Sequence, residues 1–272
     1  MPSFLHAGGL AFATLVIPWA AIAAIGHALE RASPAEAGQR ARDIGLNIRY
    51  TLLFTLIRAA AAPLLAAASL LIVGALGGGI ITLPSRGWPV IGSCLVFFLA
   101  IDFAEYAFHR AQHSSRLLWA LHSLHHSDPA LNVTTTFRHQ WLDIFIKAIL
   151  VYPAVGILFK ASGPAIAFSS IASFSAFFSH ANLRLSLGPL WAVLNNPQYH
   201  RIHHSSLACH RDKNFAAILP LWDLAFGTCH RPRPGEFPPT GLTDAEPPRR
   251  VVEMLVWPLA ARPGLEAAAT PR

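Results

Sequence analysis

The sequence predicts an all-α, multi-pass transmembrane protein with about four to five spans and a cytosolic helical cap. Three observations predict this fold class. The 272 residues are 53% hydrophobic and 13% charged, whereas a soluble domain usually has about a quarter charged residues. Several runs are apolar over the length that a bilayer requires. Three clusters of histidine lie at or beyond the ends of these runs, where a cap outside the membrane would carry them.

The predicted spans are apolar runs, because a helix needs roughly 20 apolar residues to cross the hydrocarbon layer. Five runs meet or approach this length, and they cover residues 3–29, 59–83, 87–108, 148–159 and 161–183. The third run carries Asp102 and Glu105 in its last two turns. The fourth is short. The last two runs are compatible with two spans or with a hairpin that enters the membrane and returns.

The basic residues predict the orientation of these spans. They are concentrated in residues 30–49, 109–141 and 184–272, and the opposite connections hold almost none. Because cytoplasmic loops are enriched in Lys and Arg, we expect the N-terminus outside and the histidine clusters and C-terminal tail in the cytoplasm. The net charge of +7 then reflects loops facing anionic lipid, and no nucleic-acid partner is predicted.

Nine histidines form three clusters and one single residue with spacings HxxxH, HxxHH, H and HxxHH. They are His109, His113, His122, His125, His126, His180, His200, His203 and His204. Helical residues three and four apart share one face, so each cluster can aim its rings at one point. Imidazole suits iron, zinc, copper and nickel. Nine rings exceed the coordination of one ion, which favours two ions sharing them.

Other polar residues near the clusters are weaker candidates. Asp102, Glu105 and Asp128 are candidates for orienting the ligands, because metal-bound histidines use such partners; solvated residues at helix ends are the alternative. His180 ends the fifth run, where an unpaired polar ring is costly, so it is a candidate ligand. The isolated His6, His27, His210 and His230 are expected to be structural or interfacial.

Cysteine usage and the termini exclude several other classes. Cys94, Cys209 and Cys229 form no CxxC pair, which excludes a thiolate zinc site and a built-in iron–sulfur cluster, and their odd number gives no disulfide framework. No cleavable signal peptide is expected, because the first five residues carry no Lys or Arg. We expect an N-terminal transmembrane region in 1–86, a central domain in 87–230 and an extended Pro-rich tail in 231–272.

The central part resembles the fatty acid hydroxylase/sterol desaturase superfamily of integral-membrane di-iron enzymes. The matching motifs are Asp102…Tyr106…His109-Arg110…His113, Leu118-Trp119…His122…His125-His126-Ser127-Asp128, Asn132-Val133-Thr134-Thr135, Ser179-His180-Ala181-Asn182, Asn196-Pro197…His200-Arg201-Ile202-His203-His204-Ser205 and Leu221-Trp222-Asp223…Phe226-Gly227-Thr228. This motif order is specific for the superfamily and much less specific for a substrate. Residues 1–100 match only as membrane spans.

The resemblance implies a helical membrane domain whose cap holds two iron ions on the nine histidines of the clusters, with zinc a candidate substitute in purified protein. It implies hydroxylation or desaturation of a lipid with O₂ as co-substrate, and it favours hydroxylation. The lipid stays open between sterol, fatty acyl, carotenoid and other isoprenoid substrates. No further domain resembles an electron carrier, so we expect a separate donor of the ferredoxin or cytochrome b5 type.

Two departures from the family pattern concern the neighbourhood of the clusters. Many members have Arg-x-His after the Thr pair, whereas here His139 follows Arg138 directly and Gln140 takes the place of that histidine, so His139 is a weak candidate ligand. Many members have Asn-Tyr-Gly after the third cluster, whereas this chain has Asn214-Phe215-Ala216. The second change affects packing or substrate fit near the site.

Two other functions compete with a lipid oxygenase. A metal transporter or metal-binding membrane protein would also need many histidines, but transporters place their ligands near the bilayer midplane, and most of these histidines lie outside the spans. A zinc hydrolase needs three ligands and a general-base carboxylate. The HExxH motif is absent from the sequence, and nine histidines are too many for such a site.

Overall fold

Long helices dominate the computed structural model, which describes residues 2–259 and the side chains of residues 17–259. Helices α1 (Pro2–Ala32), α2 (Ala41–Ala75) and α3 (Pro89–Ser114) are the longest. The shorter elements are α4 (Arg116–His126), η1 (Val133–Phe137), α5 (Asp143–Ile146), the π-helical η2 (Lys147–Val151), α6 (Tyr152–Leu158), α7 (Gly163–Ala172), α8 (Ser175–His180), η3 (Gly188–Ala192), α9 (Pro197–His203), η4 (Ala208–His210), α10 (Leu221–Phe226) and α11 (Val251–Leu255). The two short strands are β1 (Ile81–Thr82) and β2 (Phe159–Lys160). The predicted helical fold class is confirmed.

Among the residues that the structure describes, two helices are long and apolar enough to cross a membrane, α2 and α3. Helix α2 begins well before the predicted second run. Its first half packs, through the buried Leu46 and Phe54, against the part of the molecule that contains the histidine clusters, which we call the cap. Its second half is exposed, with Leu64 at 68% and Leu71 at 73% of the side-chain surface. Such a continuous apolar surface requires a non-aqueous neighbour.

The predicted second run extends to residue 83, but helix α2 ends at Ala75. The glycines that follow explain the difference, because Gly77 and Gly79 have φ values of 64° and 77°, which only glycine adopts without strain. At Gly78 a Cβ would lie 2.9 Å from the backbone of Ile157. This close approach brings β1 beside β2 in a parallel pair, with Ile81 opposite Phe159.

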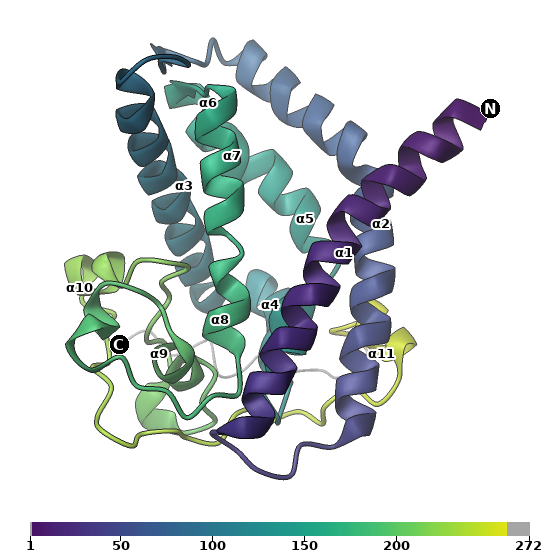
Figure 1. Cartoon of the computed structure of the whole chain (residues 1–272), viewed down its shortest axis with the longest axis vertical. Coiled ribbons are helices and arrows are strands. Elements are labelled where there is room, and N and C mark those ends of the chain that lie inside the picture. Colours follow the sequence, from purple (N-terminus) through teal and green to yellow (C-terminus); the bar gives the residue numbers. More distant parts are fainter. Residues whose placement is uncertain (1, 260–272) are drawn as a thin grey trace.

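The segment of the fourth and fifth predicted runs folds as a hairpin of short helices. Elements α5, η2 and α6 lead from the cap to the β1–β2 end, and α7 and α8 return to the cap (Figure 1). Helix α7 packs against α3. The number of spans and the membrane orientation stay predictions, and the first predicted run lies within α1, partly outside the described side chains.

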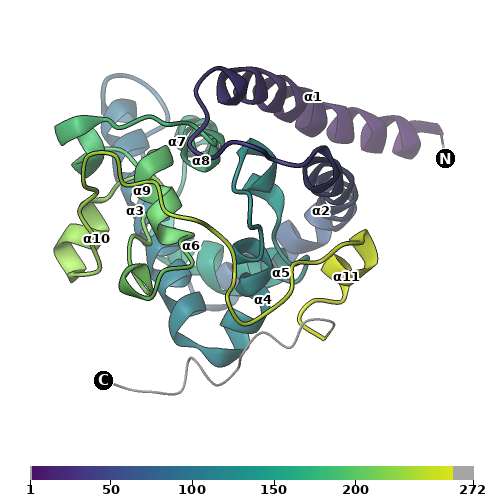
Figure 2. The same ribbon diagram turned by 90° about the horizontal axis from the view of Figure 1, so that it is seen from below.

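The cap gathers at the end of the molecule opposite the β1–β2 pair (Figures 1 and 2). One of its cores joins three elements, with Tyr50 from α2, Leu124 from α4 and Met254 from α11. The predicted C-terminal tail takes part in this packing. Trp257 is buried and donates from Nε1 to Ser123 Oγ at 2.9 Å. Residues 231–259 of the tail therefore pack against the cap, and we call them the strap. Residues 260–272 lie outside the described part.

A buried carboxylate attaches α1 to the cap. Glu30 is 3% exposed and accepts hydrogen bonds from the backbone nitrogens of Val133 at 2.7 Å and Asn182 at 2.8 Å. Val133 belongs to η1, and Asn182 follows α8. Because a buried carboxylate needs such partners, this contact fixes where the first helix meets the segments around the histidines.

Candidate metal centre

Four helix ends carry the nine predicted histidines. Helix α3 presents two of them in its last turns, α4 presents three, α8 ends at one, and α9 presents three at its C-terminal end: His109, His113, His122, His125, His126, His180, His200, His203 and His204. Two of these helices have N-terminal residues whose side chains cap the first turn. Ser115 Oγ accepts from the backbone nitrogen of Leu118, and Asn196 Oδ1 accepts from those of Gln198 and Tyr199. These two N-cap residues fix where α4 and α9 start, and therefore which helix faces their histidines occupy.

The structure divides the nine histidines into two sets. We call them the five-histidine set (His109, His113, His122, His126 and His203) and the four-histidine set (His125, His180, His200 and His204). Within each set, one ring nitrogen per residue lies within 4.8 Å of the others. Helices α4 and α9 serve both sets, because adjacent residues on a helix point about 100° apart. The sets touch where the rings of His126 and His204 stack with centroids 4.4 Å apart.

Backbone carbonyls orient three of the rings. His109 Nδ1 lies 2.8 Å from the carbonyl oxygen of Phe215, His203 Nδ1 2.8 Å from that of Lys213, and His180 Nδ1 2.7 Å from that of Ala176. A carbonyl only accepts, so each Nδ1 donates and each Nε2 presents a lone pair. This is the tautomer of a histidine that binds a metal through Nε2.

The ring nitrogens that face the centre lie against one another or have no partner. His180 Nε2 lies 3.0 Å from His200 Nε2 and 3.1 Å from His125 Nε2. The Nε2 atoms of His113, His126 and His203 are buried and have no hydrogen-bond partner among the residues described. Buried lone pairs without partners are unfavourable, and a cation between them would remove this cost. The donor set therefore fits metal ions that imidazole prefers.

Burial also keeps these rings neutral. Outside the apolar helices, burial lowers the pKa of His203 to about 4. Burial and then the neighbouring imidazoles lower the pKa of His126 and His204 well below the ordinary value. Neutral imidazole is the form that binds metal, so near neutral pH no proton competes strongly for these sites.

A loop between α9 and α10 supplies two of the orienting carbonyls. Asp223 of α10 holds this loop, because its carboxylate accepts from the backbone nitrogens of Phe215 at 2.9 Å and Ala216 at 2.7 Å. Asn214 adopts a φ of 62°, which asparagine tolerates better than most residues. The sequence alone assigns Asp223 no role, because this aspartate acts on the main chain of a loop and not on a histidine. The motif Leu221-Trp222-Asp223 is the sequence feature that could have pointed to it.

The three predicted carboxylates lie elsewhere. Asp102 accepts from Trp222 Nε1 at 2.8 Å and from two backbone nitrogens, Glu105 pairs with Lys147 at 2.7 Å, and Asp128 accepts from Asn47 and Thr135, both at 2.7 Å. Among residues 17–259, none of the three forms a hydrogen bond or ion pair with the nine histidines. They hold the elements that surround the centre.

The structure places His139 beside the centre. Its ring stacks on that of His125 with centroids 4.2 Å apart and planes 12° apart, yet it belongs to neither set. Its backbone oxygen accepts from Tyr50 Oη at 2.6 Å. The histidine displaced by one residue from the family pattern thus packs against a candidate ligand.

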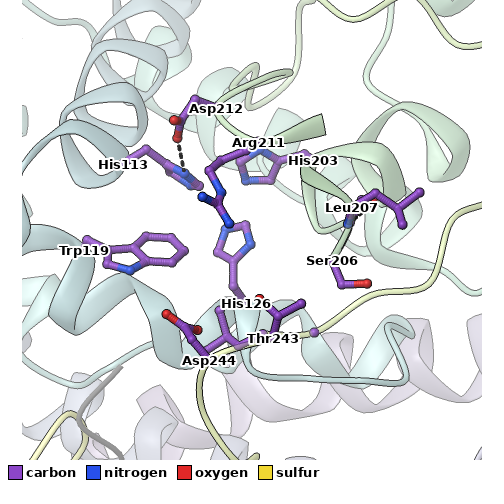
Figure 3. A pocket seen from close by; sticks show the side chains of 13 residues that line it. His113, Trp119, His126, His203, Ser206, Leu207, Arg211, Asp212, Thr243 and Asp244 are labelled. Atoms are coloured by element: carbon purple, nitrogen blue, oxygen red, sulfur yellow. Dashed lines mark hydrogen bonds and ion pairs between the residues drawn. The ribbon is translucent and has the colours of Figure 1, made fainter. Parts of the chain in front are cut away.

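A pocket of about 100 Å³ opens onto the five-histidine set (Figure 3). His113, His126 and His203 line it, together with Trp119 and residues 205–207, 211–212 and 241–244. Asp212 Oδ1 lies 3.5 Å from His113 Nδ1 at its wall. The pocket connects the histidines with the outside of the cap.

Apolar helices that carry a buried polyhistidine centre at one end define the class, a membrane-associated protein built to hold metal. Residues 94–228 match the family model of the fatty acid hydroxylases. The chain belongs to the fatty acid hydroxylase superfamily, as its motifs predict.

Curated relatives agree with this assignment. Human alkylglycerol monooxygenase is 36% identical over 131 residues, which are 48% of this chain and 29% of that protein. The ornithine lipid hydroxylase OlsE of Rhizobium tropici is 29% identical over 145 residues, 53% of this chain and 44% of that protein. The very-long-chain aldehyde decarbonylase GL1-1 of Oryza sativa is 28% identical over 155 residues, which are 52% of this chain and 24% of that protein. The similarity thus spans less than half of each relative, and no solved structure matches the chain.

Proposed function

We propose that this chain is a membrane-bound di-iron oxygenase that hydroxylates a lipid with O₂ and external electrons. The observation that carries the proposal is the division of nine histidines into two adjacent sets. Two sets that share helices α4 and α9 suit two neighbouring ions better than one ion or two distant ones. The names of the relatives, a monooxygenase and a lipid hydroxylase, point to the same reaction class.

In this proposal each set binds one iron through its ring nitrogens. When bound, a di-iron centre supplies the oxidising power that an unactivated C–H bond requires. The contributions of the chain itself are orientation and exclusion of water. The carbonyls of Phe215, Lys213 and Ala176 fix three rings. Burial of the rings restricts water to the small pocket beside the five-histidine set.

The substrate class is a membrane lipid with an alkyl chain. An alkylglycerol is the first substrate to test and an ornithine lipid the second, because relatives are named for them. The exposed apolar surfaces of α2 and α3 suit a bilayer, and the histidines lie at the cap end of α3. An alkyl chain that leaves the membrane beside α3 would therefore meet the histidines where it enters the cap.

The cap faces the cytoplasm in this proposal, because the basic residues are concentrated in the cap segments. A separate ferredoxin or cytochrome b5 would deliver electrons there. Arg211 beside the pocket onto the five-histidine set gives such a donor a cationic contact close to the metals.

The test combines metal and product analysis on the purified full-length chain. We expect about two iron ions in the two sets, and incorporation of one ¹⁸O atom from ¹⁸O₂ into an alkylglycerol when reductant is supplied. A His126→Ala variant is expected to incorporate none. Alkylglycerol and ornithine lipid that both stay unlabelled with the iron-loaded chain and an active reductase would contradict the proposed reaction.

A metal transporter is not favoured. Transport sites lie inside broken helices near the bilayer midplane, whereas the nine histidines here lie at helix ends, with His109 and His113 in the last turns of α3. His180 at the end of α8 contacts His125 and His200. Retention of both metals after a chelator challenge would support the enzyme, and exchange of metal across a vesicle membrane would support transport.

A further inference from the structure

Two histidines that the sequence left isolated meet at a second place on the cap. His210 Nε2 lies 3.2 Å from Glu236 Oε1, and His230 Nε2 lies 3.3 Å from the same oxygen. The ring centroids of the two histidines are 4.6 Å apart. One ligand atom from each of the three residues lies within 4.8 Å of the others, and none of the three belongs to the five- or four-histidine set.

Hydrogen bonds on the outer side fix the directions of two of the three side chains. His210 Nδ1 lies 2.9 Å from Ser205 Oγ, which leaves Nε2 to face the carboxylate. Glu236 Oε2 accepts from the backbone nitrogen of Arg233 at 2.8 Å and also lies 3.4 Å from His230 Nε2, while Oε1 lies close to both histidines. Gln198 Nε2 donates to the carbonyls of both Arg233 and Glu236. Ligands held by outer partners in this way are typical of metal sites.

The backbone of the third residue is held as well. His230 donates from its nitrogen to Asn214 Oδ1 at 2.7 Å, and its carbonyl accepts from Asn214 Nδ2 at 3.1 Å. Asn214 stands between Lys213 and Phe215, whose carbonyls orient His203 and His109. The second cluster thus lies at the base of the loop that serves the five-histidine set.

One divalent cation can take the place of the protons between these three side chains. The two Nε2 atoms lie 3.2 and 3.3 Å from Glu236 Oε1, and double protonation of the rings, whose centroids are 4.6 Å apart, would place two like charges beside one carboxylate. His210 is 3% exposed, so water cannot replace its partner, whereas the side chains of His230 and Glu236 are 20% and 19% exposed and leave room for one outer ligand. Two imidazoles, one carboxylate and a water form a tetrahedral zinc site.

We propose that His210, His230 and Glu236 bind a third metal ion, Zn²⁺, with water as its fourth ligand. The ion would tie η4, which ends at His210, to the segment after α10 that carries His230 and Glu236. The backbone of His230 is in turn bonded to Asn214 of the loop of residues 211–216. A bound ion links segments that are 26 residues apart in sequence and restrains the loop whose carbonyls orient two histidines of the main centre. Its removal is therefore expected to loosen the loop without removing any ligand of the two large sets.

The test compares metal content between the wild-type chain and His230→Gln, with Glu236→Gln as a second variant. Each full-length protein is purified in detergent, equilibrated with Zn²⁺, desalted and analysed for metal and protein. We expect each variant to bind one zinc ion per chain fewer than the wild type. This difference does not depend on how many ions the nine histidines hold, so it separates the third site from the proposed di-iron function.

The matched control is His27→Gln, which alters a single histidine 3.6 Å from a carboxylate, that of Glu30, and is expected to keep the wild-type zinc content. Co²⁺ provides a second readout, because a four-coordinate site with nitrogen and oxygen ligands has visible absorption that His230→Gln should diminish. Equal zinc content and equal Co²⁺ absorption in wild type and in both folded variants, judged by monodispersity and thermal unfolding, would overturn the site.

Discussion

His203 donates from Nδ1 to the carbonyl of Lys213 at 2.8 Å, and its Nε2 points into the five-histidine set without a hydrogen-bond partner in residues 17–259. The contact joins a ligand candidate to a loop that the sequence marks only as a departure from the family pattern. A main-chain carbonyl thus fixes the orientation of a ring whose other nitrogen faces the centre.

Replacement of a histidine in the five-histidine set is expected to remove one metal site. We expect His126→Ala to bind about one iron ion per chain fewer than wild type and to lose lipid hydroxylation, because its Nε2 is buried at the centre. Metal analysis of the purified chain measures this.

The matched control replaces a histidine that touches the centre but belongs to neither set. His139→Gln removes the stacking of this ring on His125 and its longer contact with the ring of His122. We expect it to retain the full metal content, and loss of an ion from this variant would show that His139 is a ligand.

Removal of the Asp223 carboxylate is expected to weaken metal binding indirectly. In Asp223→Asn one of the two backbone nitrogens, that of Phe215 or that of Ala216, loses its acceptor and meets an amide NH₂ group instead, so the carbonyls that orient His109 and His203 shift. We expect metal affinity to fall about 10- to 100-fold, the usual effect of losing an outer partner. Competition with a chromophoric chelator measures it. The exposed Glu246→Gln serves as the control, and an Asp223→Asn chain with wild-type affinity would refute the role.

Asp102 is expected to contribute to stability and not to metal binding. Its carboxylate accepts from Trp222 Nε1 and from the backbone nitrogens of Ile218 and Leu219. Asp102→Ala leaves these donors without their acceptor, which costs about 1–3 kcal/mol for a buried group. Thermal unfolding should show the loss while metal content per folded chain stays constant. A variant of normal stability that has lost metal would instead support the ligand-orienting role considered from the sequence.

Acid is expected to destabilise the metal-free chain. Burial holds the pKa of His203 at about 4, below the ordinary 6.5. Above pH 6.5 both the folded and unfolded states are neutral at this residue. Between pH 6.5 and 4 the unfolded state binds more protons than the folded state. The free energy of unfolding therefore decreases as the pH is lowered, by roughly 1.4 kcal/mol per pH unit for each such histidine.

Unfolding temperatures of the chelator-treated chain at several pH values test this. We expect little change between pH 8 and 7 and a steady decrease below pH 6.5. Saturating metal should raise the unfolding temperature most at neutral pH, because protons displace metal in acid. An unfolding temperature of the metal-free chain that is constant from pH 7 to pH 5 would contradict neutral, buried rings.

Much of the centre could be predicted because its information is local. The HxxxH and HxxHH spacings place ligands on one face of a helix whatever the rest of the fold does, and all nine predicted histidines come together. Asp102, Glu105 and Asp128 were harder to interpret, because proximity in sequence or along a helix does not say which neighbour a carboxylate faces. Helix α2 also begins earlier than hydropathy indicated, since Arg42, Asp43, Arg49 and Arg58 interrupt the apolar sequence of its first half.

The sequence by itself determined the class of protein, because apolar length and histidine spacing are properties of short segments. Only the tertiary structure decided how the histidines divide into five and four, which carbonyls orient them, and that His210, His230 and Glu236 meet. These relationships join segments far apart in the chain, and they depend on how helices pack and where loops turn. Neither periodicity nor composition contains that information, because the contacts arise between elements and not within them.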